Sequence, residues 1–218
     1  MSMDVSNIRI IEKPDWVSWE DIHQVLYRAH EENRSKGMVM ALPMKPAEEI
    51  AKIVGDEGIM FVTLDDTKVI GTCAIVPKKI KNKWYANEKF AYICFASLLP
   101  EYRGLGIFGE MERMRLAKVK ELGYTAIYGD THENNIHRIE IAKKDGFKIV
   151  DYIPWKNHYN KAIIKWMGDC PYSDRYINFR FQLSRIFVKL RYRLDEKGIH
   201  DRLSFLVAIK SKVKSILS

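Results

Sequence analysis

Apolar and polar positions follow two spacings along the chain, one typical of strands and one typical of helices. Helical spacing begins after the candidate N-cap Ser18, where Ile22, Val25, Leu26 and Ala29 recur three or four positions apart. Apolar runs of strand length, bounded by polar or glycine-containing turns, predict β-structure. Strands are expected at residues 7–12, 58–64, 69–76, 90–99, 125–129, 147–152 and 159–167, and helices from 18 to about 36 and at 47–54, 110–122 and 135–144.

The order of these elements predicts one parallel crossover among antiparallel hairpins. The run 90–99 is apolar on both faces, as a central strand is, and the helix 110–122 connects it to the strand 125–129. The fold class expected is α+β (mixed α/β), with a domain at residues 1–168. Residues 169–218 are expected to form a basic amphipathic helical extension.

The loop between the central strand and its crossover helix carries the clearest chemistry. It reads Arg103-Gly104-Leu105-Gly106-Ile107-Phe108-Gly109. A strand, a glycine-rich turn and a helix N-terminus together present backbone N–H groups and the positive end of the helix dipole to one point. Arg103 adds a full positive charge. The loop therefore predicts a ligand that carries phosphate.

Two motifs in this order resemble the GCN5-related N-acetyltransferase (GNAT) superfamily. The acyl-CoA signature Arg/Gln-x-x-Gly-x-Gly/Ala matches residues 103–108, after the typical Pro100-Glu101-Tyr102. A second family frame matches residues 135–147, with Asn135 and Gly146-Phe147 in register. The resemblance implies the acyl-CoA N-acyltransferase fold, whose largely antiparallel sheet contains a splayed parallel strand pair.

The resemblance also implies that acetyl-CoA is the co-substrate and that no metal is needed. The pyrophosphate would lie on the loop amides, the pantetheine arm would pair with the freed strand edge, and a strand amide would polarise the thioester. The residues expected to bind coenzyme A are Leu98, Leu99, Arg103, Gly104, Leu105, Gly106, Ile107, Phe108, Gly109 and Asn135.

Two positions depart from the family pattern. Phe108 stands where the signature ends in Gly or Ala, so its side chain must point away from the phosphates. Ala142 stands where the family frequently has the Tyr that protonates the departing thiolate. Alanine cannot donate a proton, so the usual general acid is absent from this position.

The candidate catalytic residues are Asp130 and His132, with Glu133 beside them. They follow the predicted strand 125–129, near the expected splay, where one of them could accept a proton from an amine. The alternative interpretation is a polar loop with an Asx turn that caps the next helix.

Composition indicates a globular chain in a reducing compartment. The 218 residues are 47% hydrophobic and 29% charged, and the N-terminal residues 1–6 are too polar for a signal peptide. Cys73, Cys94 and Cys170 are far apart and odd in number, which favours free thiols over disulfides or a metal site. A cytoplasmic location is therefore expected.

The charge of the chain is concentrated at its C-terminal end. From residue 169 onward, eleven basic and five acidic side chains supply +6 of the net +8. Two apolar patterns at helical spacing accompany the charge, and Gly198 separates them. They predict helices that pack on the catalytic domain, pair in a homodimer or lie on an anionic membrane. No nucleic-acid-reading motif accompanies the charge. The first pattern contains Leu183, Ile186, Phe187, Leu190 and Leu194, and the second contains Leu206, Ile209, Val213, Ile216 and Leu217.

Together these features predict an acyl-CoA-dependent N-acyltransferase that transfers acetyl to a primary amine of a small molecule, by direct attack in a ternary complex. The extension resembles those of acetyltransferases encoded near bacterial surface-polysaccharide genes, which suggests an amino-sugar acceptor. Because of Ala142, a catalytically degenerate module that binds CoA, a partner or a membrane is the alternative.

Overall fold

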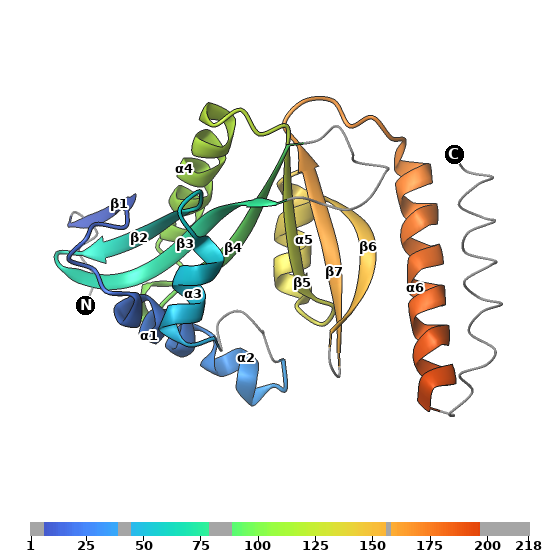
Figure 1. Cartoon of the computed structure of the whole chain (residues 1–218), viewed down its shortest axis with the longest axis horizontal. Helices are drawn as coiled ribbons and strands as arrows, with labels where there is room; N and C mark the ends of the chain where they lie inside the picture. Colours follow the sequence, from blue (N-terminus) through green and yellow to red (C-terminus); the bar gives the residue numbers. More distant parts are fainter. Residues whose placement is uncertain (1–6, 39–44, 79–88, 156–157, 197–218) are drawn as a thin grey trace. The chain divides into compact units, whose positions relative to one another are not determined.

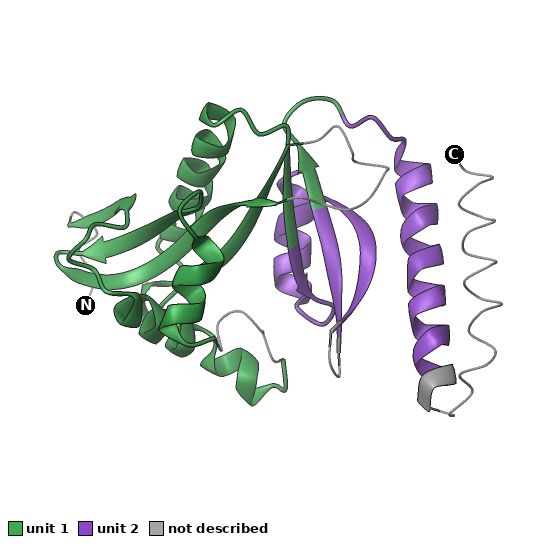
Figure 2. Cartoon of the chain, in the orientation of Figure 1, with its two compact units in different colours: residues 1–129, 164–169 green, residues 130–163, 170–218 purple. Residues whose placement is uncertain are grey.

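The computed structural model describes residues 7–38, 45–78, 89–155 and 158–196. The chain forms two compact units, coloured separately in Figure 2. Unit 1 contains residues 1–129 and 164–169, and unit 2 contains residues 130–163 and 170–218. Two strands cross from one unit to the other, and each unit is described by itself.

Hydrogen bonds connect seven strands of the described chain in the order β1-β2-β3-β4-β5-β7-β6 (Figure 1). The mixed α+β class expected from the sequence is confirmed, because β4 and β5 are parallel while β1 to β4 pair antiparallel. The strands are β1 (Ile8–Glu12), β2 (Ile59–Asp65), β3 (Lys68–Lys78), β4 (Phe90–Leu98), β5 (Ala126–His132), β6 (Lys148–Trp155) and β7 (His158–Trp166).

Helices cover both faces of the sheet in unit 1. Helices α1 (Trp19–Ala29) and α3 (Ala47–Val54) pack their apolar stripes on one face, where Ile22, Leu26 and Ile50 are fully buried. Helix α4 (Ile107–Glu121) covers the opposite face (Figure 1). Ser18 caps α1 as expected and forms a reciprocal capping box with Asp21.

A β-bulge interrupts β4 just before the glycine loop. Thr72 pairs with Ser97 but Ala74 pairs with Cys94, so Phe95 and Ala96 together face one position of β3. Phe95 adopts a left-handed φ of 54°, and its carbonyl accepts a hydrogen bond from the buried Thr72 hydroxyl at 2.8 Å. The bulge sets which face of the sheet the last β4 side chains occupy.

Parallel pairing between β4 and β5 is short. Within the described chain it extends from Phe90, opposite Ala126, to Tyr92, opposite Tyr128, although β4 continues to Leu98. The last six residues of β4 thus lack β5 as a partner, which agrees with the splayed pair that the resemblance implied.

In unit 2, helix α6 (Asp174–Glu196) packs along β6. Ile177 and Phe181 are buried on its inner side, and Ser184 hydrogen-bonds Asp151 and the Tyr152 backbone. Helix α5 (Ile136–Lys144) lies in the same unit. Packing of α6 on β6 is one of the arrangements expected for the extension, while a domain boundary at residue 168 stays a prediction.

Three of the differences between expected and observed element boundaries bear on the candidate site. Helix α4 begins at Ile107 rather than Glu110, directly after the left-handed N-cap Gly106, and it includes Gly109. The expected helix from 18 to 36 breaks at His30, and the short α2 (Glu31–Ser35) follows. Strand β5 continues to His132, so the polar loop expected after residue 129 is wrong.

Candidate active site

The loop between β4 and α4 depends on glycines at two positions. A single 3₁₀ turn, η3 (Pro100–Tyr102), leaves β4, and Gly104 and Gly106 follow with φ of 81° and 80°. A side chain at either position would strain the backbone. The left-handed Gly106 is also the N-cap of α4, so the chain turns sharply there and the helix begins at the next residue.

The N-terminus of α4 has backbone donors that precede the helical hydrogen bonds. The amide of Glu110 bonds back into the helix, to the Gly106 carbonyl at 3.2 Å. The amides of Ile107 and Gly109 precede it, and the first amides of a helix have no acceptor within the helix. A Cβ at Gly109 would meet no described atom within 4 Å, so the backbone there leaves room for a ligand.

Side chains of the loop tie it to unit 1. The buried Tyr102 donates its hydroxyl proton to Asp65 at 2.7 Å, and this bond raises the pKa of Tyr102 to about 12. Glu101 forms an ion pair with Arg28 of α1 at 3.1 Å. These two bonds therefore attach the loop to the end of β2 and to α1.

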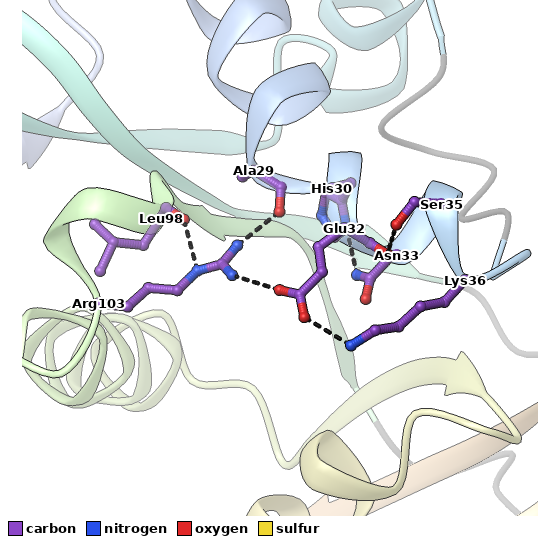
Figure 3. Close-up of polar contacts among 8 residues, drawn as sticks. All are labelled: Ala29, His30, Glu32, Asn33, Ser35, Lys36, Leu98 and Arg103. Atoms are coloured by element: carbon purple, nitrogen blue, oxygen red, sulfur yellow. Dashed lines mark hydrogen bonds and ion pairs between the residues drawn. The ribbon is translucent and has the colours of Figure 1, made fainter.

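Arg103 points toward the end of α1 (Figure 3). Its guanidinium donates to the Ala29 carbonyl at 2.7 Å, to the Leu98 carbonyl at 3.4 Å, and to Glu32 at 3.4 Å. The sequence predicted a charge for phosphate binding here. In the structure the same charge binds the C-terminal carbonyl of α1, which joins that helix to the loop.

The two leucines at the end of β4 differ in what their backbones offer. Leu99 donates its amide to the Ile70 carbonyl at 2.9 Å, toward β3. Because neighbouring strand residues direct their amides to opposite sides, the Leu98 amide faces away from β3. Of the two predicted contacts, the Leu98 amide is the one directed to the edge that β5 leaves uncovered.

Sequence reasoning missed a polar cluster beside this edge. His30, at the break between α1 and α2, places Nε2 2.9 Å from the hydroxyl of Ser97. The Asn33 amide nitrogen lies 3.1 Å from the other ring nitrogen, Nδ1 (Figure 3). Burial, Arg103 and Arg34 lower the pKa of His30 to about 4, so the ring is neutral at pH 7. The 67-residue separation of His30 and Ser97 left no local signal.

An aromatic pair joins β4 and β5 where the two strands are paired. The rings of Tyr92 and Tyr128 are 5.8 Å apart, and the Lys78 ammonium lies 4.1 Å and 4.8 Å from their centroids. Tyr92 packs against the core that faces α1 and α3. The aromatic pair and the Ser97 hydroxyl therefore belong to the same face of the sheet.

The predicted catalytic residues lie in unit 2. Asp130 accepts a hydrogen bond from Asn160 at 2.9 Å. His132 is buried, its Nδ1 accepts from the Asn134 amide at 3.1 Å, and burial lowers its pKa. Glu133 accepts from the Tyr152 hydroxyl at 2.6 Å. Hydrogen bonds within unit 2 thus engage all three side chains, and their catalytic role stays a prediction.

Two further sequence-predicted positions lie in or next to α5. Asn135 is its N-cap and accepts from the Arg138 amide at 3.3 Å, so the residue that caps α5 is Asn135 and not one of the three candidate catalytic residues. Ala142, at the position of the family's frequent Tyr, is 1% exposed. A contact of Asn135 with the cofactor stays a prediction.

The three cysteines form no disulfide in the structure. They are Cys73, Cys94 and Cys170, and burial raises the pKa of the Cys73 thiol to about 11. The described residues contain no group of three or more His, Cys, Asp or Glu side chains arranged for a metal ion. Among the same residues, no helix combines the length and apolarity required to cross a membrane.

Comparison of the sequence with family models finds the acetyltransferase (GNAT) family over residues 16–147. This match contains the glycine loop and the second motif. No curated protein matches the sequence.

Solved structures with the same fold are numerous and distant. A GNAT family acetyltransferase from Elizabethkingia anophelis, with acetyl-CoA bound, is 16% identical with a TM-score of 0.55, covering 74% of this chain and 99% of its own. An aminoglycoside 6'-N-acetyltransferase complexed with coenzyme A is 15% identical with a TM-score of 0.56, at 75% and 99% coverage. The NatC complex bound to Gag peptide and CoA is 12% identical with a TM-score of 0.58, at 74% and 99%.

Proposed function

The chain belongs to the acetyltransferase (GNAT) family, and we propose that it transfers the acetyl group of acetyl-CoA to a primary amine of a small molecule. The observation that carries the proposal is the junction of β4, the glycine loop and α4. It combines a strand edge that β5 leaves uncovered with a helix N-terminus whose first amides precede the helical hydrogen bonds.

The donor site fits a pyrophosphate in shape and charge. Among the described residues, no atom lies within 4 Å of where a Cβ would lie at Gly104, Gly106 or Gly109, so the loop leaves room for a ligand on those sides of its backbone. The dipole of α4 favours an anion at the amides of Ile107 and Phe108. We assign the phosphate contacts to this backbone, and to Arg103 the task of holding the loop against α1.

The thioester would lie along the end of β4. The Leu98 amide is directed to the uncovered edge and would donate to the carbonyl oxygen, which makes the carbonyl carbon a better electrophile. Acetyl-CoA supplies an activated acetyl group with a good leaving group. Since thiolate departs readily, a missing Tyr at Ala142 costs at most the roughly 10²–10⁴-fold that general acid catalysis contributes.

The acceptor is proposed to be an amino sugar or a similar polar amine. One structural neighbour acetylates aminoglycosides and another was solved with a peptide, so the fold alone does not select the acceptor. The aromatic pair Tyr92 and Tyr128 could stack on a sugar ring from the side of the sheet that faces α1.

We propose peripheral contact of α6 with an anionic membrane as a second property. Ile186 and Leu190 are exposed and line a groove of about 330 Å³ together with Arg185 and Arg193. Lys189 also lines this groove, and its ammonium lies over the rings of Tyr152 and Tyr159. Exposed apolar side chains between cations suit the interface of an anionic bilayer.

Two measurements test the transfer function. Acetyl-CoA at saturating concentration should raise the melting temperature of the full chain, since a ligand that binds the folded state stabilises it. Release of free thiol should then depend on an amine from a panel of amino sugars, aminoglycosides and polyamines. Stabilisation without thiol release from any amine would favour the degenerate binding module, and no stabilisation by acetyl-CoA would refute the donor assignment.

A further inference from the structure

Three side chains next to the edge of β4 that β5 leaves uncovered form a chain of hydrogen bonds, in which each group donates to the next. The Asn33 amide nitrogen, which can only donate, faces Nδ1 of His30. Nδ1 is therefore the acceptor, and a neutral imidazole then carries its proton on Nε2, which faces the Ser97 oxygen. His30 donates to Ser97, and the Ser97 hydroxyl proton is left to donate onward.

The surroundings of His30 favour this arrangement. The ring is half-buried, and the guanidinium groups of Arg103 and Arg34 oppose a second proton on it, which lowers its pKa to about 4. Such a ring is a poor base near pH 7 but a good neutral donor. Proton abstraction through Ser97 is thus disfavoured, and donation through it is favoured.

The position of Ser97 directs its proton to the reacting group. Ser97 immediately precedes Leu98, whose amide faces the uncovered edge of β4. A hydroxyl and the amide of the next residue are close enough in covalent structure to converge on one oxygen atom. The bulge at Phe95 and Ala96 places the Ser97 side chain on the face of α1, where it meets His30.

We propose that the Ser97 hydroxyl donates a hydrogen bond to the thioester carbonyl oxygen of bound acetyl-CoA, beside the Leu98 amide, and that His30 and Asn33 are the positioning residues that direct it. This inference rests on the proposed function. The hydroxyl keeps its proton throughout. The amine nitrogen attacks the carbonyl carbon and forms the new C–N bond, and the negative charge that then resides on the oxygen is what Ser97 stabilises. When the carbonyl re-forms, the C–S bond breaks and the proton lost by the amine nitrogen passes to the departing thiolate, so the products are the N-acetyl amine and CoA thiol.

The experiment uses the carbonyl stretch of acetyl-CoA labelled with ¹³C at the carbonyl carbon and bound to the full chain. A hydrogen bond to a carbonyl lowers its stretching frequency, so Ser97→Ala should raise the frequency. With an amine acceptor, Ser97→Ala should lower kcat by about 10²–10³-fold, the usual loss for one oxyanion donor. The KM for acetyl-CoA should change little, and Ser97→Thr, which keeps a hydroxyl, should retain the low frequency.

Asn33→Asp tests the direction of the chain without removing the hydroxyl. A carboxylate would accept a proton from Nδ1, so Nε2 would become an acceptor and take the Ser97 proton. The carbonyl frequency should then rise as it does in Ser97→Ala. Ser35→Ala is the matched control. It removes a hydroxyl from the same short helix, together with its hydrogen bond to the Glu32 carbonyl, and it should leave the carbonyl frequency unchanged.

Three results would overturn the inference. If the carbonyl frequency is equal in the wild type and in Ser97→Ala, Ser97 does not donate to the thioester carbonyl, even where the wild type transfers acetyl normally. An acetyl group on Ser97, found by intact-mass analysis and peptide mapping after mixing with acetyl-CoA, would show that the hydroxyl is a nucleophile. Its proton would then pass to His30, which is the opposite direction to the one proposed. A wild type that acetyl-CoA does not stabilise against heat would refute the proposed function, and this inference with it.

Discussion

At the residue scale, donor binding is proposed to depend on the backbone rather than on a side chain. Gly109 is the third residue of α4, and a Cβ at this position would meet no described atom within 4 Å. Its backbone does not adopt a positive φ, so other residues fit there without strain. This position allows the charge at the helix N-terminus to be changed while the fold is kept.

Gly109→Glu should abolish stabilisation by acetyl-CoA while the free protein melts at the same or a higher temperature. A carboxylate in the first helical turn favours the helix, and replacing glycine adds roughly 0.5–1 kcal/mol, but the same charge repels a pyrophosphate. Thermal unfolding with and without acetyl-CoA measures both effects. Gly109→Gln, of equal size and no charge, should keep most of the binding; equal binding by the Glu and Gln variants would contradict the phosphate site.

His30 should make folding stability depend on pH. Its pKa is about 4 in the folded protein and about 6.5 when unfolded, so the unfolded chain binds more protons between these values. The neutral ring's contribution is complete above pH 6.5 and is lost as the pH falls toward 4. The loss reaches about 3 kcal/mol at pH 4, at 1.36 kcal/mol per pKa unit.

Urea unfolding at pH 7 and pH 4 tests this dependence. His30→Gln keeps hydrogen-bonding groups at this position but does not titrate. In this variant the difference in unfolding free energy between pH 7 and pH 4 should be about 3 kcal/mol smaller than in the wild type. A variant with the same pH dependence as the wild type would show that the ring is not shielded as the structure has it.

At the element scale, the sequence predicted the glycine loop because its chemistry is local. Gly104 and Gly106 lie two positions apart in one turn, and both have the positive φ that glycine favours. Ser97 and His30 could not be found in this way, since a β-bulge and a helix break bring them together. Neither feature leaves a periodic pattern of apolar residues.

The end of β5 was also missed for a physical reason. The alternation of apolar residues stops after Gly129, so the strand was expected to stop there as well. The backbone continues to His132 because β7 pairs with it: the Glu133 amide donates to the Tyr159 carbonyl at 2.9 Å, and the side chains of Asn160 and Asp130 add a hydrogen bond between the two strands. Pairing with a neighbouring strand overrode the local pattern.

Arg103 connects two elements, and its replacement should affect both. Arg103→Ala should destabilise the fold by about 1–2 kcal/mol, because the Ala29 carbonyl loses a charge-assisted donor and the exposed ion pair with Glu32 adds little. It should also weaken acetyl-CoA binding by releasing the loop. Arg103→Lys should restore little, since lysine lacks the planar fork that reaches two carbonyls at once.

Urea unfolding and calorimetric titration with acetyl-CoA separate these effects. If Arg103→Ala unfolds like the wild type and loses only binding, then Arg103 contacts the phosphates directly and its bonds to α1 are secondary.

At the scale of the whole molecule, the C-terminal helix has two different faces. Its inner side packs Ile177 and Phe181 on β6, while two members of the apolar set predicted from spacing, Ile186 and Leu190, face solvent. Spacing alone showed an amphipathic helix but not which side is covered. The covered side also contains Ser184, whose bonds to β6 no hydrophobic pattern could reveal.

The exposed side should bind anionic vesicles. We expect the full chain to pellet with phosphatidylserine vesicles at low salt, to remain in the supernatant with phosphatidylcholine alone, and to lose binding as salt screens the cations. Ile186→Ser should reduce pelleting several-fold. Ile136→Ser is the matched control, because Ile136 of α5 is 58% exposed and Ile186 is 60% exposed. Equal loss in both variants would show a nonspecific effect, and a wild-type dimer that Ile186→Ser converts to a monomer would make this face a protein interface instead.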